Sequence, residues 1–141
     1  MADSRRKGRI AALQVLYEAD CTGHDWRDAL ERTIAQDELG DVSAALAREL
    51  TQGVMEQREL LDALIASYAP SFPVQQMAAI DRAILRIAIF EILMQNKTPP
   101  KVVVNEAVEL AKTFGGENLH RFINGVLGSV LDDAAAASKK T

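Results

Sequence analysis

The most apolar part of the chain is QMAAIDRAILRIAIFEILMQ, residues 76–95 of 141. Apolar residues lie almost all round its helical wheel, and a helix of that kind is surrounded by other helices. We therefore expect this stretch to be the central, buried helix of an all-α fold. Arg82 and Arg86 lie on it four residues apart. Because a buried arginine is costly without a carboxylate or carbonyl groups to receive it, we expect a structural ion pair here rather than a ligand site.

Helical periodicity continues on the C-terminal side of this stretch. Thr98-Pro99-Pro100 is a good helix start, since Thr can cap and Pro suits the first turn. Gly115-Gly116 is expected to stop that helix. The last helix follows a 3–4–3–4 apolar rhythm from Leu119 to Leu131. Gly125 and Gly128 within it are expected to allow the close approach of a neighbouring helix, and residues 134–141 are expected to fray.

On the N-terminal side the apolar spacing predicts a first helix over residues 4–20 and a second over about 25–37. A third helix should begin near residue 42. A break is expected around residues 53–57, and a further apolar stripe ends at Pro70 and Pro73. We therefore predict about seven helices and no strand, in one domain that spans the whole chain.

Composition limits the classes of function. The chain has a net charge of −4, 48% apolar residues and a single cysteine, Cys21, which favours a reducing compartment. We expect no membrane span and no secretory signal, and hence the cytoplasm. No glycine-rich phosphate loop is present, and His24 and His120 lack ligands at metal-binding spacing. We therefore expect no cofactor, no metal and no enzymatic activity.

The first nine residues differ from the rest of this acidic chain. Arg5, Arg6, Lys7 and Arg9 place four cations in five positions, directly before an apolar helical pattern. Such a cluster indicates a local site for a polyanion, on a docked helix rather than a free tail. Nucleic acid is the first partner to consider. The alternative is a solvated N-terminal turn without a ligand.

Three stretches together resemble the NusB family of transcription antitermination factors. They are RRKGRIAALQVLY at residues 5–17, IDRAILRIAIFEI at residues 80–92, and KVVVNEAVELAKTFGGENLHRFINGVLGSV at residues 101–130. The resemblance implies two small helical subdomains, about 1–70 and 71–135, around the central helix. It also implies a role without catalysis. The small and polar residues at 136–141 are expected to form a frayed tail.

The resemblance implies three kinds of partner. The first is single-stranded boxA-type RNA from ribosomal RNA operons. The second is NusE, which is also small ribosomal subunit protein ten and binds this RNA jointly with the chain. The third is RNA polymerase with other Nus factors. The complex then joins RNA polymerase and other Nus factors, and suppresses premature termination. A homodimer of the free protein remains open.

The resemblance also implies roles for single residues. The N-terminal cations match phosphate contacts, which give affinity rather than sequence choice. Five further positions match RNA contacts: Tyr17, Tyr68, Phe114, Asn118 and Phe122. Each has a simpler alternative: the phenylalanines could be core, the tyrosines amphipathic surface residues, and Asn118 a helix cap. We expect the cations and Asn118 to share one exposed surface.

Gln75 and Asp81 are the candidate positions for contact with NusE. The alternative for Asp81 is a first-turn carboxylate stabilised by its own helix dipole. Two other functions stay open. One is an RNA-binding module related to the N-terminal domain of ribosomal RNA cytosine methyltransferases, and the other is a helical adaptor that dimerises without RNA.

Overall fold

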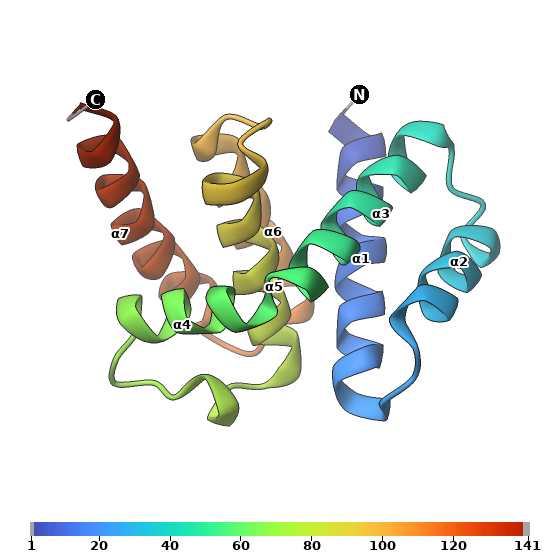
Figure 1. Cartoon of the computed structure of the whole chain (residues 1–141), viewed down its shortest axis with the longest axis horizontal. Helices are drawn as coiled ribbons and strands as arrows, with labels where there is room; N and C mark the ends of the chain where they lie inside the picture. The colour runs from blue at the N-terminus through green and yellow to red at the C-terminus, as the bar shows by residue number, and fades with distance from the viewer. Residues whose placement is uncertain (1, 140–141) are drawn as a thin grey trace. The chain divides into compact units, whose positions relative to one another are not determined.

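The apolar centre of the sequence forms α5, Ala79–Ile89, in which Ala83 to Ile89 are seven consecutive buried residues. This computed structural model describes residues 2–139, with side chains described for residues 4–136. Those residues form seven α-helices and two short helical segments, and they contain no strand (Figure 1). The predicted all-α class is confirmed.

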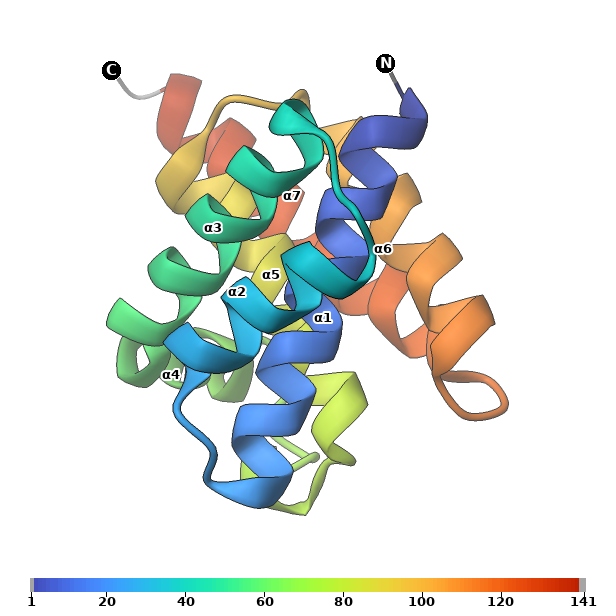
Figure 2. The same ribbon diagram turned by 90° about the vertical axis from the view of Figure 1, so that its right-hand side faces the viewer.

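The chain divides into two compact units, Met1–Glu56 and Gln57–Thr141. The first unit holds α1 (Ala2–Thr22), α2 (Trp26–Gln36) and α3 (Asp41–Glu56). Helix α1 packs on both α3 and α2, and α2 also contacts α3 (Figure 2). The core between them contains three alanines, Ala11, Ala29 and Ala47, each at most 1% exposed, beside the larger Val15 and Leu30. Because alanine has only a methyl group, the three helices can lie close together.

Local signals set the ends of these helices. The Asp25 carboxylate accepts a hydrogen bond from the backbone N–H of Arg27 at 2.8 Å and caps α2. Gly23 ends α1 with φ of +74°, a left-handed conformation that glycine adopts without strain. Helix α3 ends at Glu56 and α4 begins at Arg58, so the expected break near residues 53–57 is confirmed.

The second unit holds α4 (Arg58–Tyr68), the 3-10 turn η1 (Val74–Gln76), α5, the π-helical turn η2 (Phe90–Gln95), α6 (Pro100–Phe114) and α7 (Leu119–Lys139). Helix α5 contacts α4, α6 and α7 (Figure 1). Its two arginines are received as expected. Arg86 donates to both carboxylate oxygens of Asp62 on α4, at 2.7 and 2.9 Å. Arg82 donates to backbone carbonyls, among them that of Met77 at 2.8 Å.

The boundary between the units lies at residue 56, whereas the resemblance placed it near residue 70. Helix α4 belongs to the second unit because polar bonds tie it to α5 and α7. Asp62 on α4 accepts hydrogen bonds from Arg86 on α5. The hydroxyl of Tyr68, also on α4, donates to Asp133 on α7 at 2.8 Å.

Other local expectations are wrong. Pro99 rather than Thr98 occupies the N-cap of α6, and no side chain caps it. A Cβ added at Gly125 or Gly128 would meet nothing within 4 Å, so neither glycine serves a close helix approach. The expected fraying from residue 134 is not seen as far as Lys139, because alanine is the strongest helix former. Residues 140–141 lie outside the described part of the chain.

Candidate nucleic-acid interface

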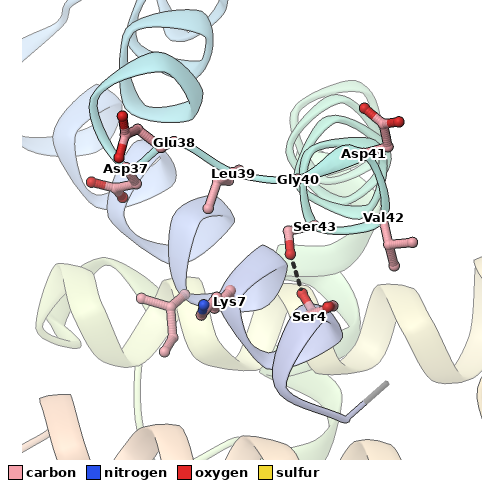
Figure 3. A pocket seen from close by; sticks show the side chains of 10 residues that line it. Ser4, Lys7, Asp37, Glu38, Leu39, Gly40, Asp41, Val42 and Ser43 are labelled. Atoms are coloured by element: carbon pink, nitrogen blue, oxygen red, sulfur yellow. Dashed lines mark hydrogen bonds between the residues drawn. The ribbon is translucent and has the colours of Figure 1, made fainter.

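The N-terminal cations lie on the first turns of α1, and contacts with α3 hold these turns in place. A Cβ added at Gly8 would lie 2.8 Å from the Ser43 carbonyl oxygen and 3.1 Å from the Leu46 Cβ. Only glycine allows this approach without a shift. The Ser43 hydroxyl also donates to the Ser4 carbonyl at 2.7 Å (Figure 3). The cluster is therefore mounted on a docked helix, as the sequence indicated.

The four cations differ in exposure. Arg6 and Lys7 are exposed, Arg5 is half-buried, and Arg9 is only 3% exposed. Arg9 lies four residues before Leu13 and seven before Leu16, so it shares their buried stripe on α1. Burial removes its guanidinium from contact with solvent in this structure, which favours a structural role at this position.

A pocket of about 440 Å³ lies beside Lys7, between α1 and the connection from α2 to α3. Asp37, Glu38 and Asp41 contribute carboxylates to its lining, and Figure 3 shows them turned away from Lys7. Lys7 forms no ion pair with any residue that the structure describes. Its ammonium group can therefore receive a phosphate, while the three carboxylates repel an anionic strand from the α2–α3 connection.

The two tyrosines occupy different environments. The Tyr17 side chain on α1 is 45% exposed. Tyr68 at the end of α4 is half-buried, and its hydroxyl is engaged by Asp133. Burial, together with the hydrogen bond to this carboxylate, raises the pKa of Tyr68 above its usual value. Tyr68 is thus anchored within the second unit by its hydroxyl.

Phe114 and Asn118 flank the connection between α6 and α7. Phe114 is the last residue of α6 and is 37% exposed. Asn118 is exposed and has φ of +69°, a conformation that asparagine adopts more readily than most residues. Its carbonyl accepts the N–H groups of Arg121 and Phe122, at 3.2 and 3.4 Å, so its backbone starts α7.

The Asn118 side chain does not cap the helix. Its amide forms no hydrogen bond with any residue described in the structure. An amide both donates and accepts, so it can bond to the edge of a base. Asn118 therefore occupies the cap position of α7 through its backbone, and both its cap role and its RNA role stay open.

Phe122 is half-buried and contacts the ring of Phe72, which neither apolar periodicity nor the family resemblance indicated. The ring centroids of Phe122 and Phe72 lie 5.3 Å apart, with the planes tilted by 42°. Phe72 is 48% exposed. Its position between Pro70 and Pro73 could have indicated a functional role, because an aromatic residue in such a connection does not belong to the apolar face of a helix. Arg121, also exposed and also missed, lies beside Phe122 in the first turn of α7.

The two candidate partner positions lie near each other in the chain, on segments held by Arg82. This residue donates to the carbonyls of Val74 and Gln75 and so fixes η1 against α5. Gln75 is exposed. Asp81 is half-buried, and its Oδ1 atom is shielded from solvent without a hydrogen-bond partner among the residues described. This burial raises the pKa of Asp81 above its usual value.

Other site types find little support in the described part of the chain. No group of three His, Cys, Asp or Glu side chains there could hold a metal ion. Within the same residues, no helix has the length and apolar character needed to cross a membrane. His24 belongs to no such metal-binding group among these residues but contacts Glu18. Arg32, and after it His24, lower the pKa of the Glu18 carboxyl through their hydrogen bonds.

Known proteins of similar sequence cover most of this chain. The profile described as the NusB family matches residues 6–132. The transcription antitermination protein NusB of Chloroflexus aggregans is 49% identical over 133 residues, covering 93% of this chain and 89% of that protein. The protein of the same name from Dehalococcoides mccartyi is 46% identical over 140 residues, covering 99% and 98%.

Solved structures agree on the fold. NusB of T. maritima has a TM-score of 0.83 at 29% identity, and the match covers 89% of both chains. A chain in the crystal structure of antitermination factors NusB and NusE in complex with dsRNA has a TM-score of 0.85 at 22% identity, covering 94% of this chain and 99% of that one. The two relatives from Chloroflexus aggregans and Dehalococcoides mccartyi are named for transcription antitermination and not for an enzymatic activity. With a family match over most of its length and relatives at nearly half identity, this chain belongs to the NusB family.

Proposed function

We propose that this chain binds boxA-type single-stranded RNA of ribosomal RNA operons together with NusE, and thereby suppresses premature termination by RNA polymerase in a complex with other Nus factors. The observation that carries the proposal is the docked basic turn of α1. An acidic chain keeps Lys7 without an ion pair among its described residues, on a helix fixed by Gly8 and Ser43.

Phosphate contacts are assigned to Arg5, Arg6 and Lys7. These contacts supply affinity without regard to sequence, and their strength depends on salt. Arg9 would need to leave its buried position before it could contact a phosphate, so we place it last among the four. The three carboxylates at the α2–α3 connection favour a strand that stays close to α1.

Base contacts are assigned to Tyr17, Tyr68, Phe114, Asn118 and Phe122. The rings can stack on unpaired bases, and such stacking contributes about 1–3 kcal/mol per base. Tyr68 can offer only its ring, because its hydroxyl bonds to Asp133. The exposed amide of Asn118 is the group best suited to distinguish one base from another.

NusE contact is assigned to Gln75 and Asp81. A solved relative contains NusB and NusE in one complex with RNA, which supports the same pairing for this family member. Asp81 is half-buried, and the negative charge of its carboxylate suits a basic group on NusE. Because its pKa is raised, NusE binding should weaken as the pH falls through that pKa and the carboxylate takes up a proton.

RNA titration with a boxA-like strand and a scrambled strand, with and without NusE, tests the proposal. Replacing Arg5, Arg6 and Lys7 by alanine should weaken binding to both strands. Replacing Asn118 should instead narrow the difference between the strands. Arg27→Ala is the matched control, since it removes an exposed cation outside the cluster in the same unit. Equal binding of both strands by the wild-type chain with NusE would contradict the proposal.

A further inference from the structure

Phe72 is an exposed aromatic residue in a connection with restricted backbone freedom. It lies between α4 and η1, two residues after Pro70 and directly before Pro73. Each proline fixes its own φ near −65°, which limits the conformations of this short segment. The N–H of Phe72 also donates to the Ala69 carbonyl at 3.0 Å and closes a turn. The backbone that carries this ring is therefore largely ordered before any ligand binds.

The ring itself is supported from one direction by Phe122. The centroid separation of 5.3 Å lies within the range of favourable aromatic pairs. The Phe72 side chain nevertheless remains 48% exposed, while Phe122 is half-buried. Phe72 thus forms the outer member of a two-ring platform, with apolar ring surface left in water. Covering that surface with another flat group would gain contact area at little cost in conformational freedom.

Polar groups that suit a nucleotide lie close to Phe122 in the chain. Asn118 directly precedes α7 and its carbonyl accepts the N–H of Phe122, while Arg121 is the residue before Phe122 in the first turn of the helix. Arg121 forms no ion pair among the described residues and can receive a phosphate. Gly125, three residues beyond Phe122, leaves open space where a Cβ would be. An amide, a cation and exposed backbone therefore lie within four residues of Phe122 in the chain.

We propose that Phe72 is a further RNA-binding residue, which stacks on one unpaired base of single-stranded RNA and forms with Phe122 the platform that holds this base. This inference rests on the proposed RNA-binding function and assigns a residue that the family resemblance did not supply. A flat ring selects a flat partner, and the neighbouring amide and guanidinium match a base edge and a phosphate.

Fluorescence anisotropy with a labelled boxA-like strand tests the role of the ring. Phe72→Ala should raise the Kd by about 5- to 150-fold, which corresponds to the loss of one stacked base. Phe72→Leu keeps apolar area but loses the flat ring, and should resemble Phe72→Ala. Phe72→Trp should restore binding to within about twofold of the wild type, since it keeps a flat ring.

Leu60→Ala is the matched control, because Leu60 is 52% exposed and lies in the same unit on α4. This variant should leave the Kd unchanged. Thermal unfolding by circular dichroism should show that all the variants are folded. An unchanged Kd for Phe72→Ala overturns the inference, as does a weakened affinity for NusE with RNA affinity intact, which would place Phe72 in a protein contact instead.

Abasic substitution locates the stacked base. Strands that each lack one base are titrated with wild type and Phe72→Ala. For one abasic strand, the affinity of Phe72→Ala should differ from that of the wild type by less than about twofold, because the base that Phe72 contacts is already absent. The full loss should persist with every other strand. A full loss with all the abasic strands would show that the ring acts through structure and would overturn the inference.

The failure of this inference can be told apart from the failure of the proposed function. If the wild-type chain with NusE does not discriminate between boxA-like and scrambled strands, the proposed function is contradicted. If it discriminates and Phe72→Ala behaves as wild type, this inference alone is contradicted.

Discussion

Gly8 and Gly125 are two helical glycines whose replacement by alanine should change stability in opposite directions. Both substitutions raise helix propensity, which stabilises a helix interior by about 1 kcal/mol. At Gly125 the new methyl group meets nothing within 4 Å, so this gain should remain. At Gly8 the methyl group meets the Ser43 carbonyl at 2.8 Å and the Leu46 Cβ at 3.1 Å.

The loss of stability in Gly8→Ala depends on which atoms the added methyl group overlaps. The Ser43 oxygen belongs to the backbone of α3 and cannot rotate away, so α1 or α3 must move. Overpacking of this kind costs about 1–3 kcal/mol, which exceeds the helix-propensity gain or cancels it. We therefore expect Gly8→Ala to destabilise the chain by up to about 2 kcal/mol and Gly125→Ala to stabilise it by about 0.5–1 kcal/mol.

Urea unfolding followed by circular dichroism measures both free energies of unfolding. The comparison controls for composition, because both variants add the same methyl group to a helix. Stabilisation by Gly8→Ala equal to that by Gly125→Ala would refute the close packing of α1 on α3. It would also remove the reason why the basic turn is held in place.

Three further predictions concern the second unit. Asp62→Ala removes the carboxylate that receives Arg86, whose side chain is 10% exposed. We expect the free energy of unfolding in urea to fall by about 2–3 kcal/mol, and a fall below about 0.5 kcal/mol would contradict the pairing. Burial raises the pKa of Asp81, so the folded state keeps this proton to a higher pH than the unfolded state. The free energy of unfolding should therefore fall relative to that of Asp81→Asn as the pH rises from below the ordinary pKa of aspartate through the raised pKa of the folded state, and a difference independent of pH would contradict the shift. Tyr68→Phe removes the hydrogen bond to Asp133 and should lower the free energy of unfolding, measured by thermal unfolding, by about 0.5–1.5 kcal/mol. The Kd for RNA should change less than about twofold, because only the ring of Tyr68 is assigned to RNA contact.

Apolar periodicity was sufficient to predict the helices of this chain. The stretch around residue 80 is buried because its apolar residues leave no polar face, and a buried arginine on it required an acceptor, which Asp62 provides. The π-helical turn at Phe90–Gln95 could not be predicted in the same way, because its residues continue the pattern of α5. The boundary at residue 56 also escaped prediction, since it depends on which helices α4 contacts.

The candidate site was predicted in part. Residue type identified the basic cluster, but it did not separate Arg9 from its neighbours. The spacing of Arg9 from Leu13 and Leu16 contained that information, since it places Arg9 on the buried stripe of α1. Phe72 could not be found from periodicity, because its exposure and its contact with Phe122 depend on how the α4–η1 connection folds against α7.

The measurement that tests the central claim most directly is a titration of the boxA-like and scrambled strands with the chain and NusE over a series of salt concentrations. Three phosphate contacts predict a slope of about −2.1 in log K against log salt for single-stranded RNA, so a fourfold rise in salt should weaken binding by about 20-fold. The boxA-like strand should bind more tightly at every salt concentration. A slope near zero, or equal affinity for the two strands, would contradict the account.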